Sequence, residues 1–157
     1  MWKYQGIEFF SLLARHQVPF VVVGGHARNI YAPPRSTEDV DVVWMRSPDA
    51  AARLLDALRE ANACWISNER DPDTRIEKLV PVTAAYITCE HIMMLVTDYG
   101  FADLFDFVPG MPNEDVQQLY DQSVTVAGRQ YASVEWLKKM KQAAGRPKDL
   151  EDLRDLP

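Results

Sequence analysis

Cysteine and long apolar runs are both scarce in this sequence. Only two cysteines, Cys64 and Cys89, occur among its 157 residues, and they form no CxxC pair. We therefore expect neither a disulfide framework nor a zinc site. No apolar run approaches the ~20 residues that span a bilayer, and the first residues do not show the pattern of a secretory signal. These features predict a cytoplasmic protein that makes no membrane contact.

A surplus of positive charge is also missing. The 17 Lys and Arg residues are outnumbered by 23 Asp and Glu residues, which gives a formal net charge of -6. An extended nucleic-acid surface needs a basic balance, so we do not expect one here. A local basic patch does occur near the C-terminus, at residues 138–141 with Arg146 and Lys148.

The sequence lacks the best-known phosphate-binding and hydrolytic patterns as well. It contains neither GxxxxGK[ST] nor GxGxxG, and His16 and His91 form no constellation with Ser or Cys that would indicate a catalytic triad. The composition, with 47% hydrophobic and 25% charged residues, is that of a globular domain with its own core. We expect residues 1–157 to form a single domain that ends in a helical tail from residue 133 onward.

Hydrophobic periodicity and helix-breaking residues predict a mixed order of helices and strands. Helices are expected at residues 7–17, 26–31, 47–62, 114–121, 133–144 and 147–156. Strands are expected at 19–23 and 39–45, hairpins at 92–97 with 101–107 and at 123–127 with 129–132, and a loop at 68–75. The fold class is therefore α/β (α+β), a mixed β-sheet with flanking helices.

Two carboxylates, Asp39 and Asp41, begin the second predicted strand. Because side chains of a strand alternate between its two faces, both acids point the same way. They repel each other unless a cation lies between them, and a divalent metal fits that position. The alternative is a pair of solvated acids at a strand edge, but the apolar Val40, Val42 and Val43 indicate a half-buried strand where two free charges are costly.

A third acid and a diglycine complete the candidate site. Asp103 lies in the apolar segment 101–107 with Asp106, but strand alternation directs the two to opposite faces, so they are alternatives; we favour Asp103. Gly24 and Gly25 follow the first strand, either as a tight turn or as backbone N–H groups open to a phosphate chain.

Two further residues precede the acid pair. Arg35 could hold a phosphate with both guanidinium arms, and Thr37 could brace the loop. A role in stabilising the turn alone is an equal alternative for both residues.

Together these residues resemble the DNA polymerase beta-like nucleotidyltransferase superfamily. Its signature is a hydrophobic strand, a Gly-Gly or Gly-Ser turn, a short helix, and a strand with Asp-x-Asp. This sequence matches that signature at Val23-Gly24-Gly25 and Asp39-Val40-Asp41. The stretch from Arg35 is similar to the Arg-x-Thr-x-Asp-x-Asp form of small bacterial members, among them lincosamide-type antibiotic nucleotidyltransferases and nucleotidyltransferases of toxin–antitoxin pairs. The segments 101–110 and 137–150 resemble the third-acid strand and closing helices of the same group.

The resemblance implies an enzyme that transfers a nucleoside monophosphate from a nucleoside triphosphate to an acceptor hydroxyl and releases pyrophosphate. Asp39, Asp41 and Asp103 would be catalytic and would hold two Mg²⁺ (or Mn²⁺) ions. The nucleotide would be bound by residues of the turn, the loop and the tail: Gly24, Gly25, Arg35, Thr37 and Lys141. The acceptor could be an antibiotic or an RNA or protein target, and a homodimer is one expected assembly. The alternative is a catalytically degenerate module that binds nucleotides or a partner.

Overall fold

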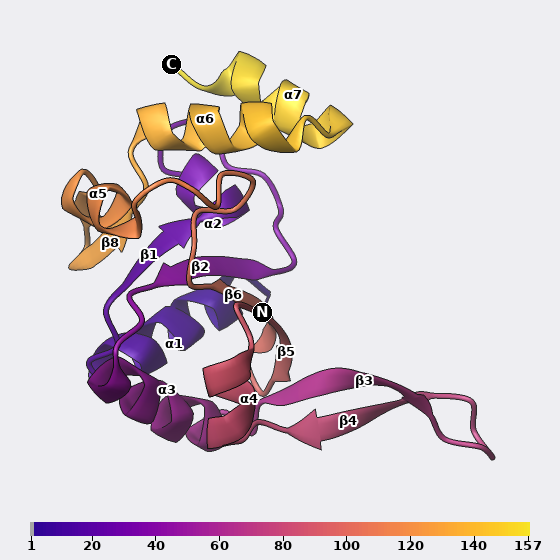
Figure 1. Cartoon of the computed structure of the whole chain (residues 1–157). Helices are drawn as coiled ribbons and strands as arrows, with labels where there is room; N and C mark the ends of the chain where they lie inside the picture. The colour runs from indigo at the N-terminus through magenta and orange to yellow at the C-terminus, as the bar shows by residue number, and fades with distance from the viewer. Residues whose placement is uncertain (1) are drawn as a thin grey trace.

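The structure is a computed structural model that describes residues 2–157, with side chains described from Ile7 onward. Its eight strands form one mixed sheet in the order β4-β3-β5-β6-β2-β1-β8-β7 (Figure 1). The elements are α1 (Trp2–Arg15), β1 (Phe20–Val23), α2 (Gly24–Arg28), β2 (Val40–Trp44), α3 (Pro48–Glu60), β3 (Cys64–Arg70), β4 (Glu77–Pro81), α4 (Ala84–Cys89), β5 (Ile92–Thr97), β6 (Gly100–Phe105), α5 (Val116–Asp121), β7 (Val124–Val126), β8 (Arg129–Tyr131), α6 (Val134–Ala144) and α7 (Pro147–Asp155).

The centre of the sheet is built from the most apolar strands. All four residues of β1 are buried, and in β2 only Asp41 is not fully buried. Such nearly continuous apolar runs suit strands that are covered on both faces. β2 pairs antiparallel with β1 and parallel with β6, so the strand that carries Asp41 lies between two others. The position of this acid is therefore fixed by ladders on both sides.

Helices cover the sheet from two sides (Figure 1). α1 and α3 lie together on one side, whereas α6 and α7 stack at the other, above α2. Ser47 caps α3 and Ser133 caps α6 by accepting backbone N–H bonds, and Gly145 ends α6 in the left-handed conformation. No helix among residues 2–157 is long and apolar enough to cross a membrane.

Several predicted elements are confirmed, although their ends shift. The hairpin of β5 and β6 and the hairpin of β7 and β8 both pair antiparallel, as expected. Asp39 lies just before β2 rather than inside it, and β6 ends at Phe105, so Asp106 follows the strand. The short helix begins at the diglycine itself instead of after it, with Gly24 at φ 66°.

The stretch from residue 64 to residue 89 was predicted only in part, since the expected loop at 68–75 is confirmed at residues 71–75 alone. Residues 68–70, expected in a loop, continue β3, and β4 and α4 were not anticipated at all. β3 and β4 pair as a hairpin that projects from the body of the molecule in Figure 1. Its charged outer half shows no apolar alternation, so its strand conformation depends on cross-strand pairing rather than on a local pattern.

Candidate active site

The diglycine brings the backbone against the acid strand. Val23, the last residue of β1, is the register partner of Asp41, and Gly24 comes next. A Cβ atom at Gly24 would lie 2.2 Å from Asp41 Oδ2, and one at Gly25 would lie 2.9 Å from Thr37 Oγ1. Since real Cβ atoms do not approach so closely, and Gly24 also has a positive φ, Gly24 requires glycine, whereas a side chain at Gly25 would force Thr37 to move. The turn therefore keeps its backbone within reach of anything bound at Asp41.

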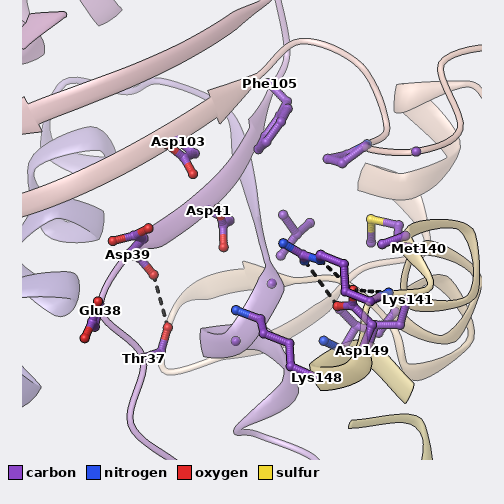
Figure 2. A pocket seen from close by; sticks show the side chains of 18 of the residues that line it. Thr37, Glu38, Asp39, Asp41, Asp103, Phe105, Met140, Lys141, Lys148 and Asp149 are labelled. Atoms are coloured by element: carbon purple, nitrogen blue, oxygen red, sulfur yellow. Dashed lines mark hydrogen bonds and ion pairs between the residues drawn. The ribbon is translucent and has the colours of Figure 1, made fainter. Parts of the chain in front are cut away.

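The three predicted acids lie around one cavity of about 510 Å³. Asp41 and Asp103 are register partners in the parallel β2–β6 pair, so their side chains emerge side by side on one face. Asp39 is exposed just before β2, and its carbonyl accepts a hydrogen bond from Thr37 Oγ1 at 3.2 Å. Figure 2 shows the three carboxylates on one side of the cavity.

Burial and mutual repulsion change the acidity of two of these groups. Burial is the largest cause that raises the pKa of Asp41 to about 7, and the charges of Asp103 and Asp39 add to it, whereas Lys148 opposes it. The pKa of Asp103 is also raised, by burial first and then by Asp39. At neutral pH this cluster therefore favours a proton or a cation among its carboxylates.

The donor set fits a hard divalent cation that is completed by a ligand. In the part of the chain that the structure describes, no three His, Cys, Asp or Glu side chains are arranged to enclose a metal ion. Mg²⁺ is usually held by one or two carboxylates together with waters and substrate phosphates, not by an all-protein cage. The adjacent carboxylates of Asp41 and Asp103, next to an open backbone turn, match that pattern.

Asp106, the alternative third acid, is held elsewhere. Its carboxylate lies 2.6 Å from Arg46 Nε and 2.8 Å from His91 Nδ1, and it does not line the cavity. Arg46 also donates to the carbonyls of Ile87 and Glu90, at the end of α4. Asp106 therefore anchors a structural cluster, and Asp103 is the acid that β6 places beside Asp41.

The predicted cationic residues line the cavity but are already paired. Asp152 of α7 accepts two hydrogen bonds from Arg35, at 3.0 and 2.7 Å, and one from Lys141 at 2.7 Å. Burial would raise the pKa of Asp152, but these bonds outweigh it and lower the pKa to about 2. Arg28 lies 3.1 Å from the same carboxylate. Arg35 and Lys141 are thus fixed in place, with part of their charge neutralised.

Lys148 was noted in the basic patch but not selected as a site residue. It lines the cavity, it has no ion-pair partner within residues 7–157, and its charge acts on Asp41. Figure 2 shows its amino group directed toward the side of the cavity where Thr37 and Asp41 lie. The sequence signal was the Arg-Pro-Lys stretch at the start of α7, which brings a cation into the cavity only because α7 folds back over α6.

The remaining wall of the cavity is apolar. It is formed by residues at the end of β6, in the following turn, and on α6: Phe105, Pro109, Gly110, Leu137, Met140 and Ala144. A cavity with acids and an open backbone at one end and an apolar wall at the other suits a ligand that has both a phosphate part and a flat, weakly polar part.

Comparison with known proteins is informative at the level of fold. No family model and no curated protein matches the chain. One similar solved structure is an antigenic nucleotidyltransferase-like protein from Paracoccidioides brasiliensis, with a TM-score of 0.50 and 18% identity over 98% of this chain and 73% of that chain. Another is JHP933 from Helicobacter pylori, with a TM-score of 0.46 and 15% identity over 93% of this chain. The chain spans only 62% of the length of JHP933.

These findings define a class of fold. The mixed sheet with its flanking helices is a nucleotidyltransferase-like fold, as the resemblance in the sequence predicted. At such low identity the similarity shows the fold alone, so activity, substrates and partners have to be argued from the cavity itself.

Proposed function

We propose that the chain is a metal-dependent nucleotidyltransferase that moves a nucleoside monophosphate from a nucleoside triphosphate to an acceptor hydroxyl. The observation that supports this most strongly is the side-by-side placement of Asp41 and Asp103, two acids 62 positions apart, beside a diglycine whose backbone touches Asp41. Neither strand stability nor packing requires two carboxylates there, and their repulsion opposes folding.

In this proposal the acids and the turn have separate roles. Asp39, Asp41 and Asp103 would hold two Mg²⁺ or Mn²⁺ ions, which would supply charge neutralisation at the phosphate oxygens on both sides of the transferred group. The backbone N–H groups of Gly24 and Gly25, at the start of α2, would donate hydrogen bonds to the oxygens of the outer phosphates. Lys148 would balance phosphate charge from the opposite side of the cavity.

The reaction requires one bond to form and one to break. The acceptor oxygen bonds to the α-phosphorus, the bond from that phosphorus to the bridging oxygen breaks, and pyrophosphate leaves. Asp103 is the residue we propose to take the proton of the acceptor hydroxyl, because it lies at the edge of the cluster nearest β5. Arg35 and Lys141, held by Asp152, would orient the phosphates.

The second part of the proposal concerns the acceptor of the nucleoside monophosphate. The sequence resemblance favours either a small antibiotic-like molecule or an RNA or protein target of a toxin–antitoxin pair. To assign it, the protein is incubated with Mg²⁺, cell extract and each nucleoside triphosphate labelled at the α-phosphate, and the labelled product is then treated with protease or ribonuclease. Label that is lost with protease indicates a protein acceptor, and label that is lost with ribonuclease indicates RNA. Label that resists both treatments indicates a small molecule.

The same labelling assay tests the site with two variants that each lose one carboxylate, Asp39→Asn and Asp56→Asn. Asp56 is exposed on α3 and outside the cavity, so its variant controls for a lost carboxylate. We expect Asp39→Asn to abolish labelling and Asp56→Asn to retain it. Equal labelling by both variants would contradict the proposed site, and nucleotide binding without any transfer would favour the degenerate binding module instead.

A further inference from the structure

The buried side chains of helix α7 are both acids. Asp149 and Asp152 are each 2% exposed, whereas Leu150 of the same helix is 47% exposed. A surface helix ordinarily buries an apolar stripe, and buried carboxylates need well-placed cations. Asp152 obtains its cations from α2, α6 and the loop before β2, and Asp149 obtains one from Arg146 at the start of α7. Specific ion pairs therefore fix how α7 lies beside the cavity.

Lys148 lies one helical turn before Asp152 on α7. Residues at this spacing share one face of a helix, so the ion pairs of Asp152 also determine where the Lys148 side chain begins. Lys148 lines the cavity, and Figure 2 shows its amino group directed toward the side where Asp41 and Thr37 lie. The helix thus presents one lysine to the acid side of the cavity.

The cations that line the cavity differ in how far their charge is neutralised. Arg35 and Lys141 are both held by the buried carboxylate of Asp152. Arg146 is held at 2.7 Å by the other buried acid of α7. Lys148 is exposed and has no acid within ion-pair distance among residues 7–157. Its ammonium group is therefore able to move between partners, whereas the other three cations are held in place.

The charge of Lys148 acts on the acid that lies closest to the diglycine. Asp103 and Asp39 raise the pKa of Asp41, and Lys148 opposes them. The lysine therefore offsets part of the repulsion within the acid cluster. A divalent cation at the same carboxylates would be repelled by this ammonium group, because the two positive charges would share one partner.

We propose that Lys148 is a mobile counter-ion that makes metal binding and triphosphate binding depend on each other; this inference rests on the proposed function. In the metal-free protein its ammonium group neutralises part of the charge of Asp41. A triphosphate that enters with its metal brings phosphate oxygens into the cavity, and together they carry more negative charge than one carboxylate. The ammonium group moves to the phosphates and no longer repels the metal.

The result of this exchange is a coupling between two ligands. A metal ion that arrives alone has to displace Lys148 from Asp41, so its affinity is low. A metal ion that arrives with a triphosphate meets no such competition, because the lysine gains a second partner. Coupling of this kind is reciprocal, so the metal raises the affinity for the triphosphate by the same factor.

The test is the binding of Mn²⁺ alone to the full chain, followed by electron paramagnetic resonance of the unbound ion. Lys148→Met should bind Mn²⁺ about fivefold more tightly than the wild type, the upper range for an ion pair with an exposed partner. Lys148→Arg keeps the charge and should bind Mn²⁺ as the wild type does. Lys138→Met is the matched control, because Lys138 does not line the cavity, and its affinity for Mn²⁺ should be that of the wild type. A non-hydrolysable triphosphate analogue should raise the affinity for Mn²⁺ less in Lys148→Met than in the wild type.

A second measurement needs neither metal nor nucleotide. In EDTA and above neutral pH, where Asp41 is ionised, Lys148→Met should lower the melting temperature of the wild type. The same substitution should have no effect in the Asp41→Asn chain, because the charge that the lysine neutralises is then gone. Circular dichroism spectra of all four chains establish that each of them is folded.

The outcomes separate this inference from the proposed function. Equal Mn²⁺ affinity of Lys148→Met and the wild type, or a loss of melting temperature that persists in Asp41→Asn, would overturn the counter-ion role and leave the proposed function standing. The absence of Mn²⁺ binding by every chain at millimolar metal would overturn the metal site, and the counter-ion role with it. Tighter Mn²⁺ binding by Lys148→Met, in a protein that transfers no nucleotide, would support the counter-ion role and contradict the transferase.

Discussion

Replacing Asp41 by Asn should stabilise the metal-free protein, although the residue lies at the proposed catalytic centre. Its carboxylate is buried beside Asp103 and Asp39, and its pKa rises from 3.8 to about 7. In an ordinary strand the loss of an acid would have little effect or would be destabilising. Here the ionised form is disfavoured in the folded chain, so a neutral side chain removes an unfavourable term.

The size of this stabilisation follows from the difference between the pKa of Asp41 in the unfolded chain and in the folded chain. The shift from 3.8 to about 7 corresponds to an upper limit of roughly 4 kcal/mol of lost stability for ionised Asp41. This loss begins as the pH rises above 3.8 and is complete above pH 7, since the folded pKa is the higher one. For a chain of this size, 1 kcal/mol changes the melting temperature by about 2–4 °C. We expect Asp41→Asn to melt about 5–15 °C higher than the wild type at pH 8.

The assay is thermal unfolding by circular dichroism in EDTA at pH 8 and again at pH 5, with Asp56→Asn as the control for an exposed acid. The advantage of Asp41→Asn should shrink at pH 5, because the wild-type carboxyl then carries a proton. Mg²⁺ should raise the melting temperature of the wild type and leave that of Asp41→Asn nearly unchanged. A variant that is less stable than the wild type at pH 8, or a gain equal at both pH values, would refute the reasoning.

Three further predictions concern the same cavity. Gly24→Ala should destabilise the fold by more than Gly128→Ala does, and it should abolish nucleotide binding. Both positions have a positive φ, but only at Gly24 would a Cβ meet a side chain, at 2.2 Å. Equal melting temperatures of the two variants would contradict this close approach. Asp152→Asn should lower the free energy of unfolding at pH 7 by about 3–5 kcal/mol in a urea titration, because it leaves buried cations unpaired. In the wild type the stabilisation by Asp152 is present above pH 3.8 and is lost as the pH falls toward 2. If the wild type and the variant still differ by the full amount at pH 2, this account of Asp152 is wrong. Asp103→Asn should abolish transfer of labelled nucleotide while Asp106→Asn retains it, and the opposite result would show that the wrong acid was chosen.

The parts of the fold that could be predicted are those that follow from the pattern of neighbouring residues in the sequence. The apolar run before Gly24 predicted β1, and the alternation around Asp41 predicted β2 and the face on which its acid lies. Strand parity made Asp103 and Asp106 alternatives, and the structure does place them in different surroundings, although Asp106 follows β6 instead of lying inside it. Such inferences succeed because a strand has a fixed two-residue period.

The parts that could not be predicted depend on contacts between distant residues. Nothing in the sequence near Arg35 indicates that Asp152, 117 positions later, holds its guanidinium. The charged outer half of β3 resembles a loop because Glu77 and its neighbours across the hairpin, not its own pattern, keep it extended. Lys148 enters the cavity only because α7 packs back against α6.

The most direct test of the central claim is calorimetric titration of a non-hydrolysable nucleoside triphosphate analogue into the protein, with and without Mg²⁺. A cluster of carboxylates beside the diglycine predicts binding that requires Mg²⁺ and that is lost in the double variant Asp39→Asn with Asp41→Asn. Binding of equal strength without the metal, or in the double variant, would contradict the assignment of this cavity as a metal–nucleotide site.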